Sequence, residues 1–170
     1  KLPFLCLLSE DSLYPIEINA VKTSKVLYFG NRENDNGYNF DDGLCVIIEN
    51  KTFSNNRKEN YLSYLTTENY EEAFKSHNFE VKRDLKNASS AQIWHYLQNL
   101  AADETLKSRT AFVLIIISNS ATKDNVNIIY GSDNNCFSVN ELKMLFSDDK
   151  CEALKGKLKL FIIDGPRGGN

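Results

Sequence analysis

Residues Lys157–Asn170 read KLKLFIIDGPRGGN, an apolar run that stops at Asp164 and continues into a loop rich in glycine and proline. A short, continuous apolar run is typical of a strand that is buried on both faces of a parallel sheet. In an open α/β sheet, ligands and catalytic groups gather at the carboxyl ends of the strands. We therefore expect residues 164–168, Asp-Gly-Pro-Arg-Gly, to lie at a functional site or at the remains of one.

Two other apolar runs predict further core strands. Leu44–Ile48 is too short for a helix and rich in β-branched residues, and Ala111–Ile117, the most apolar run of the chain, is the expected central strand. Shorter extended segments are expected at Phe79–Arg83 and at Ile128–Tyr130.

Helices are expected between these strands. Thr67 can cap a helix that ends near His77, and capping boxes of the form Ser-x-x-Gln and Ser-x-x-Glu open helices at Ser89 and Ser138. Strands that alternate with helices are joined by connections too long for hairpins, which indicates parallel strands with right-handed crossovers. The sequence therefore predicts an α/β fold.

The composition fits one globular domain with an N-terminal extension. The chain has 170 residues, 42% hydrophobic and 25% charged. Residues 1–42 are the least regular part, and we expect them to form an arm with a short strand near Lys25–Phe29. Because the chain does not start with methionine, we expect it to be a fragment or a processed product.

Charge and cysteine usage exclude several classes of partner. The net charge of −3 and the scattered basic residues predict no binding to nucleic acid or to an anionic membrane, and no apolar run approaches the roughly eighteen residues of a membrane span. Cys6, Cys45, Cys136 and Cys151 lack metal-site spacing. We expect reduced, buried or inert thiols in a cytoplasmic protein that uses neither a metal nor a cofactor.

Three loops are expected at the carboxyl ends of the core strands, spanning residues 49–60, 118–125 and 164–170. Their reactive side chains include neither cysteine nor histidine; they are Glu49, Arg57, Ser118, Asn119, Ser120, Asp124, Asp164 and Arg167. The two histidines, His77 and His95, are expected on helices away from these loops, as solvated or locally hydrogen-bonded imidazoles.

The residues alone leave several reactions open. Ser118 or Ser120 would need a base within hydrogen-bond reach to act as a nucleophile, and ordinary loop hydrogen bonding is the simpler interpretation. Asp124 and Asp164 could form an acid–base pair or stay as solvated carboxylates. The glycines that follow Asp164 lack the pattern of a phosphate-binding loop.

Five segments, in order and with family-like spacing, resemble the large subunit of a caspase: Gly43–Phe53, Phe112–Ser118, Ile129–Asp133, Asp149–Lys157 and Lys159–Ile163. The resemblance runs from about Gly43 to the end of the chain. It implies a three-layer caspase-hemoglobinase-like fold, in which a mostly parallel sheet lies between helices. It also implies that residues 43–170 form the large-subunit-like domain, and that the small subunit, through which the family dimerises, is not in this chain.

The family's catalytic pair is absent at the matching positions. In active members the central strand ends in Ser-His-Gly, whereas this chain has Ser118-Asn119-Ser120. The last strand of active members ends in Gln-Ala-Cys-Arg-Gly, so that Pro166 takes the place of the nucleophilic cysteine while Arg167 and Gly168 persist. An amide takes up no proton at neutral pH, and proline has no nucleophilic side-chain atom. The resemblance therefore implies that family-type peptide hydrolysis is lost.

The family's substrate pocket is also altered. Active members bind an aspartate side chain with the glutamine before the nucleophile and with an arginine in the loop after the first strand. Here Asp164 replaces the glutamine, and the register places Asn60 at the arginine's position, with Arg57 earlier in the loop. Two carboxylates about 4 Å apart repel by roughly 1–4 kcal/mol at solvent-like to surface dielectric.

The sequence thus predicts an inactive caspase homologue that regulates an active caspase, or a cell-death or immune signalling complex, by protein association. The predicted partners are an active caspase or a caspase small subunit, in a heterodimer or a homodimer. Two alternatives stay open: a cysteine protease whose nucleophile has moved to Cys136 or Cys151, and a stand-alone ligand-binding α/β module.

Overall fold

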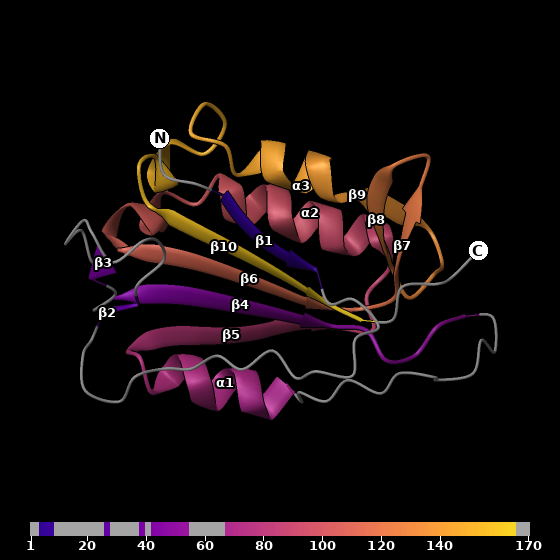
Figure 1. The fold of residues 1–170 in the computed structure, drawn as a ribbon, viewed down its shortest axis with the longest axis horizontal. Coiled ribbons are helices and arrows are strands. Elements are labelled where there is room, and N and C mark those ends of the chain that lie inside the picture. The colour runs from indigo at the N-terminus through magenta and orange to yellow at the C-terminus, as the bar shows by residue number, and fades with distance from the viewer. Residues whose placement is uncertain (1–3, 9–25, 28–37, 40–41, 55–66, 166–170) are drawn as a thin grey trace.

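The main sheet has five strands, and every neighbouring pair runs in parallel. The computed structural model describes residues 4–8, 26–27, 38–39, 42–54 and 67–165. The strands of the main sheet are β1 (Phe4–Leu8), β4 (Gly43–Glu49), β5 (Phe79–Lys86), β6 (Ala111–Ile117) and β10 (Leu158–Asp164). Their order across the sheet is β1-β10-β6-β4-β5, with β6 at the centre as the sequence predicts (Figure 1).

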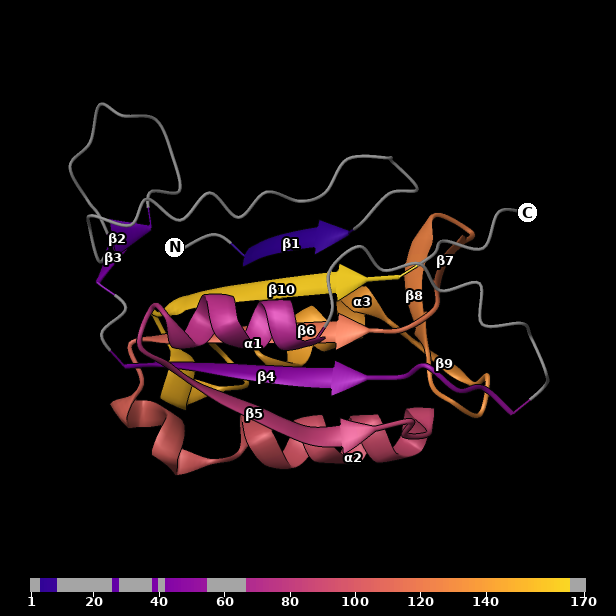
Figure 2. The ribbon, with the colours of Figure 1, turned by 90° about the horizontal axis from the view of Figure 1, so that it is seen from below.

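Helices cover both faces of this sheet. Helix α1 (Thr67–Lys75) lies on one face, and α2 (Ser90–Ala101) and α3 (Val139–Leu145) lie on the other (Figures 1 and 2). Two short 3₁₀ turns, η1 (Glu104–Ser108) and η2 (Glu152–Leu154), complete the crossovers. The arrangement is the mostly parallel, three-layer α/β fold that the sequence predicts.

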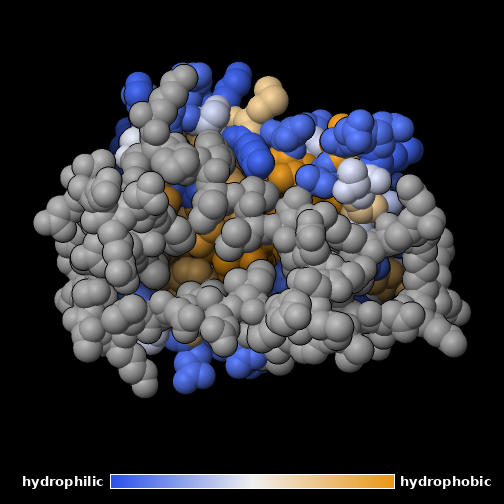
Figure 3. Space-filling view, viewed as in Figure 1, coloured by the Kyte–Doolittle hydropathy of each residue, from blue (hydrophilic) through white to orange (hydrophobic). Residues whose placement is uncertain are grey.

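Alternate residues of each inner strand supply two separate cores. Leu44, Val46 and Ile48 of β4 pack towards α2 and α3, whereas Cys45 and Ile47 pack towards α1. Every residue of β4, β6 and β10 is buried. In the view of Figure 3, described hydrophobic residues are visible at the middle of the molecule, with hydrophilic residues above and below them. Continuous apolar runs are required at such positions because both faces of each strand are covered.

Two smaller sheets accompany the main one. Strands β7 (Ser120–Lys123), β8 (Val126–Tyr130) and β9 (Cys136–Ser138) form an antiparallel sheet beyond the carboxyl ends of the main strands (Figure 2). Strands β2 (Val26–Leu27) and β3 (Tyr38–Asn39) form an antiparallel pair. The first of them falls within the strand predicted near residues 25–29.

Three details differ from the sequence predictions. Residues 118–125 are not a loop, because β7 follows at once and turns into β8 at Asp124 and Asn125, whose positive φ angles of 50° and 63° suit a tight hairpin. Thr67 does not cap α1 but is its first helical residue. The strand predicted at residues 79–83 continues to Lys86.

Both predicted capping boxes are confirmed. The Ser89 hydroxyl accepts from the Gln92 amide, and Ser138 and Glu141 make the same reciprocal pair at α3. No helix within the described ranges combines the length and the apolar character needed to cross a membrane.

Candidate functional site

The candidate site lies at the carboxyl ends of β4, β6 and β10, which point to the same side of the molecule (Figure 2). Glu49, Ile117 and Asp164 stand opposite one another in the sheet register. Because side chains alternate between faces, these three residues lie on the face that α1 covers. The parallel topology thus brings two carboxylates to the same face of one sheet edge, on either side of an apolar residue.

Asn50 and Ser118 are structural members of this edge. The Asn50 side chain accepts from the Ala88 amide at 2.8 Å and donates to the Ala88 carbonyl at 3.2 Å. The fully buried Ser118 hydroxyl donates to the Tyr130 carbonyl at 2.6 Å, and it also accepts from Asn50 at 3.5 Å. The interpretation of Ser118 as a hydrogen-bonding residue is confirmed.

Asn119 connects the central strand to β7. Its backbone carbonyl accepts a hydrogen bond of 3.0 Å from the Tyr130 amide, and its side chain is half-buried. Ser120 begins β7 and pairs with Ile129. The backbone at the position where the family resemblance expects a catalytic histidine is therefore fixed by two short strands.

Asp164 is buried within the protein and is not a solvated loop carboxylate. It is the last residue of β10, is 9% exposed, and accepts a hydrogen bond of 3.0 Å from the Tyr70 hydroxyl of α1. Asp124 lies exposed on the β7–β8 turn, a different element. These positions give no support to an acid–base pair of Asp124 and Asp164.

Glu49 is the second buried carboxylate and is held by three groups. The Thr67 hydroxyl donates to its Oε1, Lys51 contacts the same oxygen at 2.6 Å, and the Lys86 ammonium lies 3.6 Å from Oε2. Burial by itself would raise the pKa of Glu49, but the hydrogen bonds from Lys51 and Thr67 and the two positive charges together hold that pKa below its ordinary value. Glu49 is thus ionised, and the positive charges of Lys51 and Lys86 neutralise it.

Sequence reasoning missed the partners of both carboxylates. The sequence analysis predicts no site role for Tyr70 and only a capping role for Thr67, yet each hydroxyl of α1 binds one carboxylate of the sheet edge. The available signal was the sequence spacing of three, which places Thr67 and Tyr70 on one side of the first helical turn. Four predicted residues, Arg57, Asn60, Pro166 and Arg167, lie outside the described residues.

Both histidines have local partners, as predicted. The Nδ1 of His77 lies 2.7 Å from the Ala73 carbonyl, and the Nε2 of His95 lies 3.2 Å from the Asn99 amide. His77 lies in the turn after α1 and His95 lies in α2, and both bond to residues of their own segment and not to the strand ends. Within the part of the chain that the structure describes, no three side chains of the metal-ligating kinds gather.

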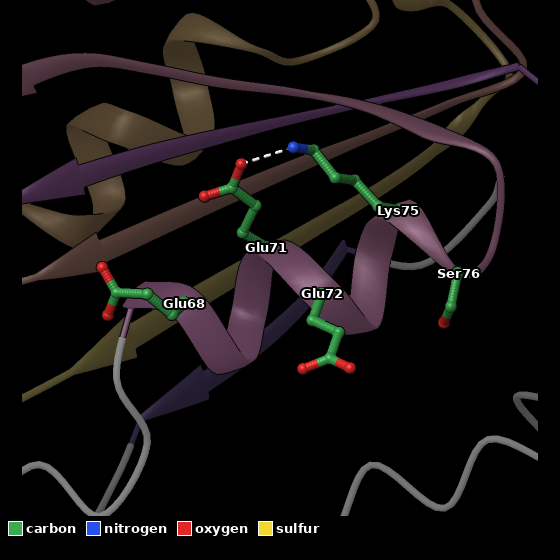
Figure 4. Close-up of a pocket in the computed structure, with 5 residues that line it drawn as sticks. All are labelled: Glu68, Glu71, Glu72, Lys75 and Ser76. Atoms are coloured by element: carbon green, nitrogen blue, oxygen red, sulfur yellow. Dashed lines mark hydrogen bonds and ion pairs between the residues drawn. The ribbon is translucent and has the colours of Figure 1, made fainter.

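A shallow pocket of about 570 Å³ lies on the outer surface of α1 and not at the strand ends (Figure 4). It is lined by Glu68, Glu71, Glu72, Lys75 and Ser76. Hydrogen bonds from Lys75 and from Arg83 of β5 lower the pKa of Glu71. Lys75 and Arg83 are exposed, Glu71 is half-buried, and the three charges pair with one another, so the pocket is a solvated helix surface.

The turn after β8 locks the small antiparallel sheet to α2. A Cβ atom on Gly131 would come within 2.0 Å of the Ser90 backbone nitrogen, so only glycine fits there. The Asp133 carboxylate accepts from the same Ser90 amide at 3.0 Å, and its pKa is lowered by this backbone hydrogen bond. The motif Gly131-Ser132-Asp133 is therefore explained by packing against a helix start.

Comparison with known proteins identifies the family to which this fold is similar. Residues 42–170 match the family model of the caspase domain. The chain is 31% identical to caspase-3 of Oryctolagus cuniculus over 162 residues, 92% of this chain and 56% of the relative, and 29% identical to caspase-3 of Felis catus over 171 residues, 94% of this chain and 59% of the relative. It is 30% identical to caspase-8 of Rattus norvegicus over 137 residues, 75% of this chain and 27% of that relative.

The chain thus spans somewhat more than half the length of the caspase-3 relatives that it matches. The match to the family model includes β4, β6 and β10 with their connecting helices, which are the elements that build the candidate site. The chain belongs to the caspase family.

Proposed function

We propose that this chain is a catalytically inactive caspase homologue that regulates an active caspase, or a cell-death or immune signalling complex, by association in the cytoplasm. The observation that carries the proposal is the pair of residues at the strand ends. Asn119 follows β6 where active members have histidine, and Pro166 follows β10 where they have cysteine. Neither residue supplies a base or a nucleophile at neutral pH.

The described side chains around these positions supply no replacement. Ser118 is buried and hydrogen-bonded to backbone, and Glu49 is ionised but already paired with two lysines. Asp164 adds a buried carboxylate at the position from which active members bind a substrate aspartate. A substrate carboxylate brought to this place would meet a like charge at low solvent exposure, which disfavours binding.

The retained fold supports a role in association. Buried residues pack on both faces of β4, β6 and β10, although the pair needed for hydrolysis is absent from the sequence. This chain would regulate a partner by binding one conformation of that partner more tightly than another. The whole protein's partners are therefore proposed to be active caspases or a caspase small subunit, in a heterodimer or a homodimer.

The test combines activity and association. The chain should cleave no peptide that carries a fluorogenic group after aspartate, and it should co-purify with a co-expressed active caspase and change that caspase's kcat/KM. A triple variant with Asn119→His, Pro166→Cys and Asp164→Gln restores the family's residues, and Asn119→His alone serves as its matched control.

Two results would count against the proposal. Cleavage by the unaltered chain that is lost in Cys136→Ala would identify a relocated nucleophile at an exposed thiol. The absence of association with every co-expressed family member, by both size exclusion and pulldown, would remove the regulatory function.

A further inference from the structure

Helix α1 is attached to the sheet differently at its two ends. It runs antiparallel to the strands, so its first turn lies towards their carboxyl ends and its last turn towards their amino ends (Figures 1 and 2). At the last turn, Phe74 packs edge to face against Phe79, with ring centroids 5.2 Å apart. At the first turn, the hydroxyls of Thr67 and Tyr70 donate to carboxylates of the sheet edge. An apolar contact therefore holds one end of α1, and polar bonds hold the other.

The residues under the first turn are closed off from solvent. Glu49, Ile117 and Asp164 are the last residues of their strands, and they are 4%, 1% and 9% exposed. Tyr70, which is 2% exposed, belongs to the same hydrophobic cluster as Ile117. Among the helices that the structure describes, α1 is the one on this face of the sheet. Its first turn therefore contributes to the burial of the strand-end edge.

The two ends of α1 differ in what opening costs. If the first turn lifted, water would replace the lost hydroxyl bonds and solvate the two carboxylates, which offsets part of the loss. If the last turn lifted, the rings of Phe74 and Phe79 would be exposed to water with no such compensation. Local openings of a folded protein follow the least costly route. The first turn should therefore open while the last turn stays packed.

We propose that Thr67 and Tyr70 form a latch that closes the strand-end edge from within the protein, and that the edge becomes accessible when the first turn of α1 lifts. Tyr70 thereby occupies Asp164, at the position from which active family members bind a substrate aspartate. A ligand of this edge binds only the open fraction, and its apparent dissociation constant rises by the inverse of that fraction. The latch concerns the site of the proposed function, but it is tested without a partner, so failure of one proposal is distinguishable from failure of the other.

The first experiment places a thiol under the latch. Ile117→Cys is the reporter, in a chain with Cys6→Ser and Cys136→Ser, and the native Cys45 is the matched reference. Cys45 lies on the same face, about 13 Å closer to the amino ends of the strands. Iodoacetamide should label residue 117 at least about tenfold faster than Cys45, with a weaker dependence on urea, because a local opening exposes less surface than unfolding. Equal rates and equal urea dependence at the two positions would overturn the latch.

Three variants of this reporter chain separate the latch from general stability. Tyr70→Phe should raise the labelling rate at residue 117 about tenfold or more, because a bond to a carboxylate is lost. Tyr96→Phe, whose hydroxyl bonds an exposed aspartate of β5, should leave that rate within about twofold. Ile93→Val, on the other face of the sheet, should raise labelling of Cys45 but not of residue 117. An unchanged rate in Tyr70→Phe, or equal rises at both thiols in Ile93→Val, would refute the proposal.

The second experiment needs no added thiol. N-acetylimidazole acetylates tyrosine hydroxyls that reach solvent, and it should modify the buried Tyr70 only when the first turn lifts. Thr67→Val removes the other hydroxyl of the latch, so it should raise acetylation of Tyr70 about three- to tenfold. Acetylation of Tyr96, on α2, is the internal reference and should stay the same. Unchanged acetylation of Tyr70 would show that the two bonds open independently, and an equal rise at Tyr96 would show a general loss of structure; either result would overturn the latch.

Discussion

The buried hydroxyl of Tyr70 joins α1 to the last strand through one hydrogen bond to Asp164. The Thr67 hydroxyl makes the same kind of bond to Glu49 of β4, the strand on the other side of the central strand β6. Hydrogen bonds to buried charged groups contribute more than those between neutral groups, because the alternative is an incompletely solvated charge. These two bonds fix the start of α1 against the site edge.

Replacing Tyr70 by phenylalanine should lower the free energy of unfolding by about 1–3 kcal/mol, because the Asp164 carboxylate loses this donor inside the protein. Urea denaturation measures the change. Tyr96→Phe is the matched control, because its hydroxyl also donates to an aspartate, Asp84, but one that is exposed. Its effect should stay within about 0.5 kcal/mol. Equal losses in the two variants would contradict the role given to Tyr70.

The lowered pKa of Glu49 predicts that the free energy of unfolding depends on pH. Its pKa in the folded protein lies below the ordinary value of 4.5, so its stabilising effect is complete above about pH 4.5 and is lost as the pH falls through the lowered pKa. Acidification should therefore destabilise the unaltered chain more than Glu49→Gln. Urea midpoints at pH 7 and at about pH 3 measure this, with the exposed Glu72→Gln as control. If the difference in urea midpoint between the unaltered chain and Glu49→Gln were the same at both pH values, this prediction would be wrong.

At the scale of elements, local signals predict the helices and the inner strands well. The capping boxes at Ser89 and Ser138 place two helix starts correctly, because they satisfy specific backbone amides. Thr67 misled the prediction, since its hydroxyl serves a carboxylate on another element and not its own helix. Strand β7 was missed because its residues Ser120–Lys123 are mostly polar, whereas an extended segment was predicted within β8.

Substitutions at Gly131 and Gly156 distinguish two reasons for a glycine: a lack of space for a side chain, and a backbone conformation that other residues rarely adopt. Gly131→Ala should destabilise the protein by about 1–3 kcal/mol, and Gly131→Asn by more, because the added atoms meet the backbone of α2. Gly156 is the contrasting case, with φ of +71° and open space around it. There asparagine should be better tolerated than alanine, since asparagine adopts left-handed angles more readily. Thermal denaturation of the four variants measures the order of stability of the alanine and asparagine variants at each position. The same order at both positions would contradict the prediction that space selects Gly131 and backbone conformation selects Gly156.

At the scale of the whole molecule, the sequence predicts the parallel α/β fold but not how the N-terminal segment joins it. Apolar runs identify strands without specifying their neighbours, and the position of β1 next to β10 depends on long-range pairing. The candidate site is predicted in part: Asn119 and Asp164 lie at the expected strand ends, whereas the bonds from Thr67 and Tyr70 depend on how α1 packs.

The distribution of thiols gives a whole-molecule test. Cys136 is exposed, whereas Cys45 and Cys151 are buried and burial raises the pKa of both thiols. In a Cys6→Ser background, iodoacetamide should modify Cys136 in the native protein and the other two only after unfolding. Mass spectrometry of peptides locates the label, and Cys136→Ser should abolish native labelling. Early modification of Cys45 would contradict the closed core.

The pairing of β1 with β10 also has a consequence for synthesis on the ribosome. Phe4 is translated before β4, β5 and β6, whereas its partner Lys159 leaves the ribosomal tunnel only after these strands have emerged. Long-range parallel pairing of this kind forms slowly, and exposed apolar strands are prone to aggregation in the meantime. Until β10 has been translated, the uncharged residues 4–8 lack the strand with which they pair, and we expect chaperones to bind them during that interval.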